Sequence, residues 1–279
     1  MNLDFDLTMR LRLPLAPNPD RQSLYFFNLY RSGSSLTEAI AENFARSVGL
    51  MPYNLSQALY DMGVEYFDSQ NYNHSSVHLA HALQLQKLSL LGGYLFYGFR
   101  EIPADWAAGF GPTDTSVLVV RDLRDIGISQ YYAAAGHATD NKVLANHITA
   151  LRASIADAAL EEFVLRRDTL HFLNRIGGCY QPMVQSGMPV IQYEDMYVDG
   201  ALSLRRMCEH ITTPLAPHVP DDWSFEDFLS RTERAVAASG RLKNHKTGGT
   251  IRNYEKLPAD VLEAYTDKLR PNLELLGYA

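Results

Sequence analysis

The sequence predicts an α/β fold in which helices cover both faces of a central, mostly parallel sheet. The first observation is that short apolar runs alternate along the chain with longer segments of helical periodicity. This alternation is typical of right-handed βαβ crossovers and therefore of parallel strand pairing. The second is that the chain has 279 residues, 46% of them hydrophobic, without an internal repeat, low-complexity segment or linker. We therefore expect residues 1–279 to form a single domain.

Five segments have the composition of strands. Residues 1–14 alternate between apolar and polar side chains, which is typical of an edge strand, and a proline-rich turn follows. The other four segments are continuous apolar runs, as in strands that a parallel sheet buries on both faces. They are residues 24–30, 94–99, 117–120 and 189–193. Ligands bind beyond the carboxyl ends of such strands. The polar residues at those ends are Arg31, Glu101, Arg121 and Glu194.

Helical spacing of apolar residues predicts helices between these strands. The first helix begins at Leu36 and ends at Gly49, which has the residue type of a C-cap. The other helical segments are residues 77–91, 140–176 (one long or two short helices), 200–212 and 261–276, the last with Pro258 near its first turn. Residues 50–75 are polar and aromatic, and they predict short helices and loops. This part either walls a substrate pocket or is packed by its own aromatic side chains.

Charge and composition argue against several classes of partner. The formal net charge of -7 provides no basic field for a nucleic-acid backbone. No apolar run approaches the roughly 18 residues that span a bilayer, and the alternating N-terminus differs from a signal peptide. Cys179 and Cys208 lack metal-binding or redox spacing, which favours buried free thiols in a reducing compartment. We therefore expect a cytoplasmic chain with no nucleic-acid or membrane partner, and we leave monomer and homodimer open.

The loop after the strand at residues 24–30 has the composition of an anion-binding site. It consists of Arg31, Ser32, Gly33, Ser34 and Ser35. The glycine permits a positive φ, and the helix that follows offers unpaired N–H groups and about half a positive charge. The arginine adds a planar fork that fits a phosphate or a sulfate. The loop lacks the second glycine and the lysine of a Walker A motif, and a plain strand-to-helix turn is the alternative interpretation.

A second pattern, RDLRDIGISQY at residues 121–131, follows the strand at residues 117–120. Arg121 places a cation at the strand end, and Ser129 lies early in the next helix, where its hydroxyl and the helix dipole favour the same anion. The alternative is an Arg/Asp ion-pair cluster at a helix start, with Asp125 as the cap.

A third pattern, RLKNHKTGGTIRNYE, occupies residues 241–255. Together the three patterns resemble sulfotransferases that use 3′-phosphoadenosine 5′-phosphosulfate (PAPS). That family has [KR]-S-G-[ST]-[ST] after a strand, an arginine and a serine eight residues apart, and a C-terminal RKGxxGDWRN loop. Gly249, Arg252 and Asn253 match this last motif. Its other positions differ: Asn244, His245 and Lys246 replace RKG, and Thr250 and Ile251 replace Asp-Trp. The basic residue that contacts the 3′-phosphate therefore stays open among Lys243, His245, Lys246 and Arg252.

The resemblance implies a P-loop-kinase-like α/β fold with about five strands and PAPS as sulfuryl donor, which leaves as 3′-phosphoadenosine 5′-phosphate (PAP). It implies that no metal is required. A loop at about residues 240–256 would cover the nucleotide, and Arg31 would stabilise the charge on the bridging oxygen. The nucleotide-binding residues that it implies are Arg31, Ser32, Gly33, Ser34, Ser35, Arg121, Ser129, Tyr193, Lys246, Thr247, Gly248, Gly249 and Arg252.

The catalytic base is open between a carboxylate and a histidine. Many relatives have a histidine two residues before a proline at the end of the second strand, and Glu101 occupies that position here. Some carbohydrate-modifying relatives use a glutamate. His78 and His81, with His74 on the same face of a predicted helix, are the rival bases. Their spacing would also suit a metal, but one helix alone rarely encloses zinc.

The resemblance thus predicts sulfuryl transfer to a hydroxyl or amine of a small-molecule or carbohydrate acceptor. One alternative is a P-loop relative that transfers phosphoryl groups. It is disfavoured because the loop lacks the Walker lysine and an obvious metal-holding aspartate. The other is a non-catalytic nucleotide-binding protein that kept the fold. The sequence does not identify the acceptor.

Overall fold

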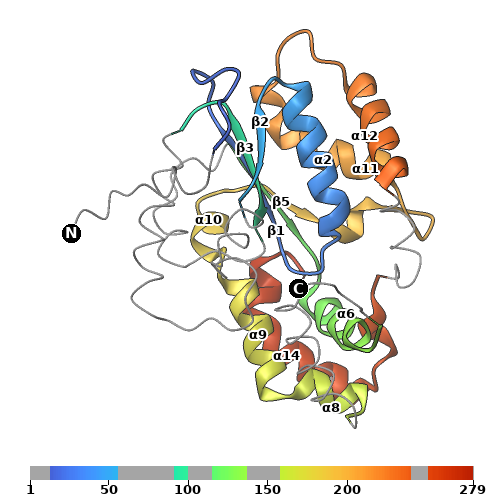
Figure 1. Cartoon of the computed structure of the whole chain (residues 1–279). Coiled ribbons are helices and arrows are strands. Elements are labelled where there is room, and N and C mark those ends of the chain that lie inside the picture. The colour runs from blue at the N-terminus through green and yellow to red at the C-terminus, as the bar shows by residue number, and fades with distance from the viewer. Residues whose placement is uncertain (1–12, 56–90, 100–114, 137–157, 240–250, 279) are drawn as a thin grey trace. The chain divides into compact units, whose positions relative to one another are not determined.

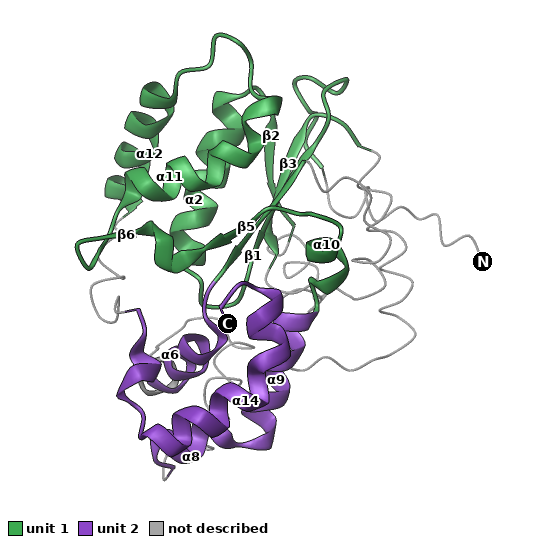
Figure 2. Cartoon of the chain, turned by 180° about the vertical axis from the view of Figure 1, so that it is seen from behind, with its two compact units in different colours: residues 1–120, 179–249 green, residues 121–178, 250–279 purple. Residues whose placement is uncertain are grey.

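The computed structural model describes residues 13–55, 91–99, 115–136, 158–239 and 251–278. These residues belong to two compact units, and each unit combines two stretches of the chain (Figure 2). Unit 1 is residues 1–120 with 179–249, and unit 2 is residues 121–178 with 250–279. The single-domain organisation expected from the sequence stays a prediction.

Unit 1 contains a five-stranded sheet in the order β2-β3-β1-β4-β5, and every neighbouring pair is parallel. The strands are β1 (Leu24–Asn28), β2 (Met51–Asn54), β3 (Tyr94–Phe99), β4 (Ser116–Val120) and β5 (Val190–Gln192). Figure 1 shows helix α2 (Ser34–Ser47) on one side of this sheet and α10 (Gln181–Gln185) on the other. The α/β class predicted from the sequence is therefore confirmed, and the arrangement is consistent with a P-loop-like fold.

The sheet is held by strands that are buried along their whole length. No residue of β1, β3 or β4 is exposed in the part of the chain that the structure describes. Tyr25 stacks on Phe96 with ring centroids 5.4 Å apart, and Phe27 lies 4.7 Å from Phe99 and 5.6 Å from Tyr180. Such aromatic pairs contribute about 0.5–1.5 kcal/mol beyond the area that they bury. The continuous apolar runs in the sequence are therefore the centre of the core.

The helices of unit 1 are α2 (Ser34–Ser47), α10 (Gln181–Gln185), α11 (Leu204–Thr212) and α12 (Phe225–Ser239). Two short 3₁₀ helices accompany them, η1 (Tyr193–Met196) and η2 (Thr213–His218). Helix α12 packs on α2 through Phe44, whose ring lies 5.8 Å from those of both Trp223 and Phe228. The Trp223 indole N–H donates to the Ser47 hydroxyl at 2.9 Å. Helix α2 ends at Ser47 with Val48 as its C-cap residue, one position before the predicted Gly49, which follows at φ 73.

Two sequence-based expectations for unit 1 are corrected. Strand β2 lies at residues 51–54, where the sequence predicted only short helices and loops. Its Pro52 is tolerated because β2 is at the edge of the sheet. The helix predicted at residues 200–212 starts later, at Leu204. A hairpin precedes it, in which β6 (Tyr197–Val198) and β7 (Ala201–Leu202) flank a turn with Asp199 at φ 50 and Gly200 at φ 76.

Unit 2 is helical. It contains α6 (Leu123–Gly136), α8 (Leu160–Leu165), α9 (Arg167–Gly178), the 3₁₀ turn η4 (Asn253–Lys256) and α14 (Ala259–Leu275). The predicted terminal helix is thus present, with Pro258 as its N-cap residue. Tyr265 of α14 is fully buried, and its hydroxyl donates to the carbonyl of Leu123 or of Arg124, each at 3.4 Å. Gly127 of α6 and Gly177 of α9 let these helices approach closely.

Three predicted segments lie wholly or mostly outside the described residues: the edge strand at 1–14, the helix at 77–91 and the greater part of the loop at about 240–256. None of the described helices combines the length and apolar character needed to cross a membrane.

Candidate functional site

The loop between β1 and α2 is tied to the carboxyl end of β4. The Leu29 N–H donates to the carbonyl of Val119 at 2.8 Å. The Ser32 hydroxyl lies within hydrogen-bonding distance of the carbonyls of Leu29 and Val119, and Ser32 is fully buried. Asn28 adds a contact from its side-chain amide to the Ser32 carbonyl at 3.4 Å. The Ser32 side chain therefore holds the loop in shape, although the sequence suggested its hydroxyl as a ligand for the anion.

Two residues of this loop have left-handed backbone conformations. Gly33 has φ 74, which confirms the positive φ expected from its residue type. Arg31 has φ 62, which costs a residue with a side chain roughly 1–2 kcal/mol. Backbone strain of this kind persists only where the surrounding structure over-determines it. The bonds of Leu29 and Ser32 to β4 provide that constraint.

Tyr193 packs directly on Gly33. A Cβ built on Gly33 would lie 2.5 Å from Cε2 of Tyr193, so no other residue type fits there without displacing the ring. Tyr193 is buried at the start of η1, and its ring makes an edge contact with Tyr197 at 5.5 Å. The Tyr197 hydroxyl donates to the Tyr193 hydroxyl at 3.3 Å. Tyr193 therefore supports the 31–35 loop. The sequence left this residue open between a side chain that faces the cofactor and a tyrosine of the core.

Helix α2 begins at this loop. Its N-cap residue, Gly33, makes no side-chain cap, and its first turn contains no acidic residue. The N–H groups of Leu36 and Thr37 bond to the Gly33 carbonyl at 2.9 and 3.1 Å. Ser34 is half-buried and Ser35 is exposed. The end of the helix is therefore suited to an anion.

The topology of the sheet also favours ligand binding at this loop. After β1 the chain continues to β2, at one edge of the sheet, and after β4 it continues to β5, at the opposite edge. Strands β1 and β4 are neighbours. The carboxyl ends of β1 and β4 are therefore the switch point of the sheet, the usual position of ligands in open α/β sheets. The loop that contains residues 29–33 starts at this switch point, directly after β1.

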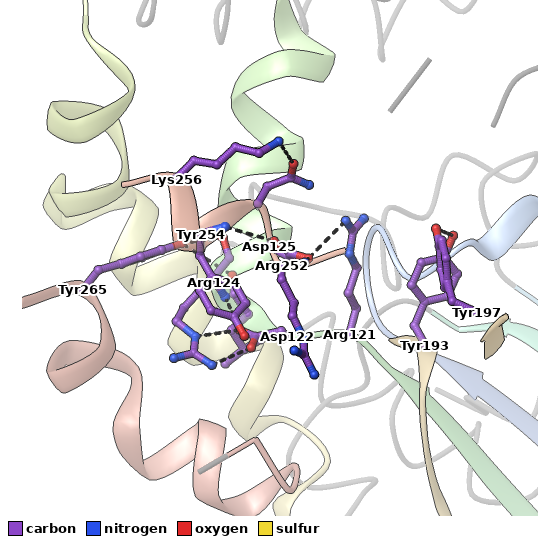
Figure 3. A network of polar contacts seen from close by, with 12 residues as sticks. Arg121, Asp122, Arg124, Asp125, Tyr193, Tyr197, Arg252, Tyr254, Lys256 and Tyr265 are labelled. Atoms are coloured by element: carbon purple, nitrogen blue, oxygen red, sulfur yellow. Dashed lines mark hydrogen bonds and ion pairs between the residues drawn. The ribbon is translucent and has the colours of Figure 1, made fainter. Parts of the chain in front are cut away.

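In unit 2, the residue that follows β4 in the chain is paired with a buried carboxylate. Arg121 is 8% exposed, and its Nη2 lies 3.5 Å from Oδ2 of Asp125 (Figure 3). Asp125 is fully buried and also accepts the N–H of Arg252 at 2.7 Å and that of Tyr254 at 3.4 Å. Burial raises the pKa of Asp125, and the charge of Arg121 opposes this shift.

Ser129 shares a side of α6 with Asp125. The two residues are four apart, and in a helix residues four apart lie one above the other. Ser129 is half-buried. Asp125 thus lies one helical turn before Ser129 and is paired with Arg121, which precedes the helix.

A second ion pair at the same helix start is structural. Asp122 caps α6 by accepting the N–H of Arg124 at 2.9 Å, and it binds the Arg124 side chain through both carboxylate oxygens at 3.0 and 2.6 Å. The Arg124 guanidinium lies over the Tyr254 ring, 4.0 Å from its centroid. The cap is therefore Asp122, whereas the sequence suggested Asp125 for that role.

The backbone and the side chain of Arg252 have different surroundings. Its N–H is bound to Asp125, its conformation is left-handed with φ 60, and the residue is exposed. The backbone therefore belongs to the structure of unit 2, while the guanidinium stays accessible. The sequence suggested Asp125 as part of an Arg/Asp ion-pair cluster, and its pair with Arg121 is present, but the contacts of its carboxylate with Arg252 and Tyr254 were missed.

The remaining site residues predicted from the sequence lie outside the described residues. They are Glu101, His78, His81, Lys246, Thr247, Gly248 and Gly249. Within the described residues, no three His, Cys, Asp or Glu side chains are grouped so that they could hold a metal ion. Comparisons with protein-family models, with curated proteins and with solved structures found no match for this chain.

Proposed function

We propose that this chain is a PAPS-dependent sulfotransferase that acts on a hydroxyl or amine of a small-molecule or carbohydrate acceptor. The observation that carries the proposal is the 31–35 loop. It contains an arginine, lies at the switch point of a parallel sheet and leads into a helix whose positive end has neither a side-chain cap nor an acidic residue. In this proposal the loop binds the 5′-phosphosulfate group.

Unit 2 supports the proposal through a second set of cationic and hydroxyl groups. Arg121 comes directly after β4, and Ser129 lies on the side of α6 that carries Asp125. The exposed guanidinium of Arg252 adds positive charge. We propose that these three residues bind the 3′-phosphate, the group that distinguishes PAPS from common adenine nucleotides. Lys246 and residues 247–249, which the resemblance also implicates, lie outside the described residues.

The chemistry requires a charge clamp, an in-line acceptor and a base. The sulfur forms a bond to the acceptor oxygen or nitrogen as its bond to the bridging oxygen breaks, and the electron pair stays on the 5′-phosphate of PAP. Arg31 would stabilise the negative charge that this phosphate gains. Glu101 is our first candidate to take the acceptor proton, and His78 and His81 are the rivals.

Equilibrium binding tests the nucleotide site. In the absence of magnesium, the wild type should bind PAP more tightly than AMP, which lacks the 3′-phosphate. The variant Arg121→Ala should weaken PAP binding by roughly 1.5–3 kcal/mol, the value of a charge-assisted hydrogen bond, and leave AMP binding nearly unchanged. The matched control is Arg205→Ala, which removes the same charge from an arginine paired with Glu226 on the surface. Equal losses for PAP and AMP would mean that Arg121 only stabilises Asp125.

Because Arg121→Ala leaves the Asp125 carboxylate buried without its cation, the variant can also lose stability. Its folded fraction should therefore be measured by circular dichroism at each titration temperature. Arg121→Lys, which keeps the charge but loses the planar fork, should fall between the wild type and Arg121→Ala in PAP affinity.

A transfer assay tests the activity and the base. With labelled PAPS and a panel of alcohols, phenols, amines and sugars, the wild type should label at least one acceptor. On that acceptor, Glu101→Gln should lower turnover by about 10² to 10⁴, the usual contribution of a positioned base, without changing PAP affinity. Near-normal turnover of Glu101→Gln combined with inactive His78→Ala or His81→Ala would move the base to the histidines.

The two alternatives make different predictions in the same experiments. A phosphoryl-transferring relative should prefer magnesium-ATP to PAP, since its transition state needs the metal. A non-catalytic nucleotide-binding protein should bind PAP but label no acceptor on a broad panel.

A further inference from the structure

The carboxylate of Asp125 contacts both a cationic side chain and a backbone turn. Oδ2 accepts the N–H of Arg252 at 2.7 Å and lies 3.5 Å from Nη2 of Arg121. Oδ1 lies 3.4 Å from the N–H of Tyr254. One carboxylate therefore holds the cation at the start of α6 and the turn that contains Arg252, although these come from distant parts of the sequence (Figure 3).

The turn at residues 252–254 depends on this carboxylate. Arg252 has φ 60, a conformation that is unfavourable for any residue with a Cβ. The backbone N–H groups of Arg252 and Tyr254 point at one anion, which is the geometry of a backbone nest. The turn also contains a hydrogen bond from the Glu255 N–H to the Arg252 carbonyl at 3.1 Å, and Arg124 stacks on Tyr254. Of these contacts, only the one with Asp125 binds the N–H of Arg252.

Asp125 in turn depends on its partners. It is fully buried, and a buried carboxylate is tolerated only where cations and N–H groups replace its water. Arg121 and the turn provide these groups together. Loss of either one leaves the charge of Asp125 poorly compensated, so Arg121 and the turn are energetically linked.

We propose that Asp125 is a positioning residue that couples Arg121 to the turn at residues 252–254. One carboxylate thereby orients two arginines that we assign to the 3′-phosphate, so this inference rests on the proposed function. Asp125 itself does not touch the nucleotide. Its effect on binding is indirect: it holds the Arg121 guanidinium in place and fixes the backbone from which the Arg252 side chain extends.

The test compares Asp125→Asn with Asp122→Asn. Both variants replace a buried aspartate at the start of α6 by its uncharged isostere. Asparagine caps helices as well as aspartate does, so Asp122→Asn should keep the cap of α6. Asp125→Asn replaces one acceptor oxygen by an NH₂ group that cannot accept, and it removes the charge opposite Arg121.

The first readout is amide hydrogen exchange, which does not require any activity. Asp125→Asn should speed exchange at Arg252 and Tyr254 by roughly tenfold or more, the loss of one hydrogen bond to a charged group, and Asp122→Asn should not. Arg121→Gln should speed exchange at the same two amides, because it weakens the hold on Asp125. Unchanged exchange in both Asp125→Asn and Arg121→Gln would overturn the coupling.

The second readout is the ratio of the PAP and AMP dissociation constants. Asp125→Asn should reduce the preference for PAP by roughly tenfold, whereas Asp122→Asn should keep it. If the wild type shows no preference for PAP, the proposed function fails while the exchange data still decide whether Asp125 couples the two elements. If Asp125→Asn does not fold, a measurement on the wild type replaces it. Saturating PAP should then slow amide exchange at Arg252 and Tyr254 in the wild type. Absence of slowing would then overturn the proposal.

Discussion

Replacing Gly33 by alanine should damage the 31–35 loop through two separable effects. The first is backbone strain, since φ is 74 and an L-residue pays roughly 1–2 kcal/mol in this region. The second is overlap, since the new Cβ would lie 2.5 Å from Cε2 of the Tyr193 ring. Overpacking of this kind costs about 1–3 kcal/mol. We therefore expect Gly33→Ala to lower the free energy of unfolding by about 3 kcal/mol.

Gly200→Ala is the matched control for the strain alone. Gly200 has φ 76, almost the value of Gly33, and a Cβ built there meets no atom within 4 Å. It should cost only about 1–2 kcal/mol. Urea unfolding followed by circular dichroism measures both variants, and the slopes should stay equal if the unfolded states are unchanged.

A double-mutant cycle isolates the contact with the ring. In a Tyr193→Ala background the overlap is gone, so Gly33→Ala should then cost about as much as Gly200→Ala. If Gly33→Ala in the wild-type background is no more destabilising than Gly200→Ala, Tyr193 does not support the loop and the reasoning is wrong.

Three further predictions follow from packing and backbone geometry. Arg31→Gly should relieve the strain at φ 62 and raise the free energy of unfolding by up to about 1 kcal/mol, while PAP binding weakens; urea unfolding and calorimetric titration check these opposite signs. Gly127→Ala would place a Cβ 2.1 Å from the Tyr265 hydroxyl, so it should destabilise unit 2 by about 1–3 kcal/mol in thermal unfolding, and Tyr265→Phe should partly rescue it. Cys179 and Cys208 are both buried, and burial raises the pKa of Cys208 to about 12, so its thiolate is fully populated only above that pH. Neither thiol should therefore react with Ellman's reagent at pH 8 until the protein is unfolded, and fast reaction of the native protein would contradict the burial.

The central strands could be predicted because their signal is local. Residues 94–99 were predicted as a strand and form β3. The prediction at 117–120 differs from β4 by one residue at one end, and the prediction at 189–193 differs from β5 by one residue at each end. Strand β2 was missed because an edge strand needs little apolar sequence and tolerates Pro52. The hairpin around Gly200 could have been predicted, because Asp-Gly between two short runs is a strong local turn signal.

The candidate site could be predicted only in part. A positive φ could be predicted for Gly33 because glycine adopts it without strain. The left-handed conformation of Arg31 could not be predicted from its residue type. The partners of Asp125 could not be found either, because its acceptor contact with Arg252 joins residues 127 positions apart. Contacts of this kind are set by the packing of α6 beside η4, which the sequence does not encode at any fixed spacing.

The composition of unit 2 from two separate stretches has a consequence for synthesis on the ribosome. Helices α6, α8 and α9 emerge early, but α14, which buries Tyr265 among them, is made only after residues 179–249 of unit 1. Until then the apolar surfaces that α14 covers are exposed, and such surfaces bind chaperones or aggregate. Unit 1 in contrast has its whole sheet once β5 has been made. We expect a nascent chain halted before α14 to resist proteases at β1–β5 and to be cleaved within residues 158–178.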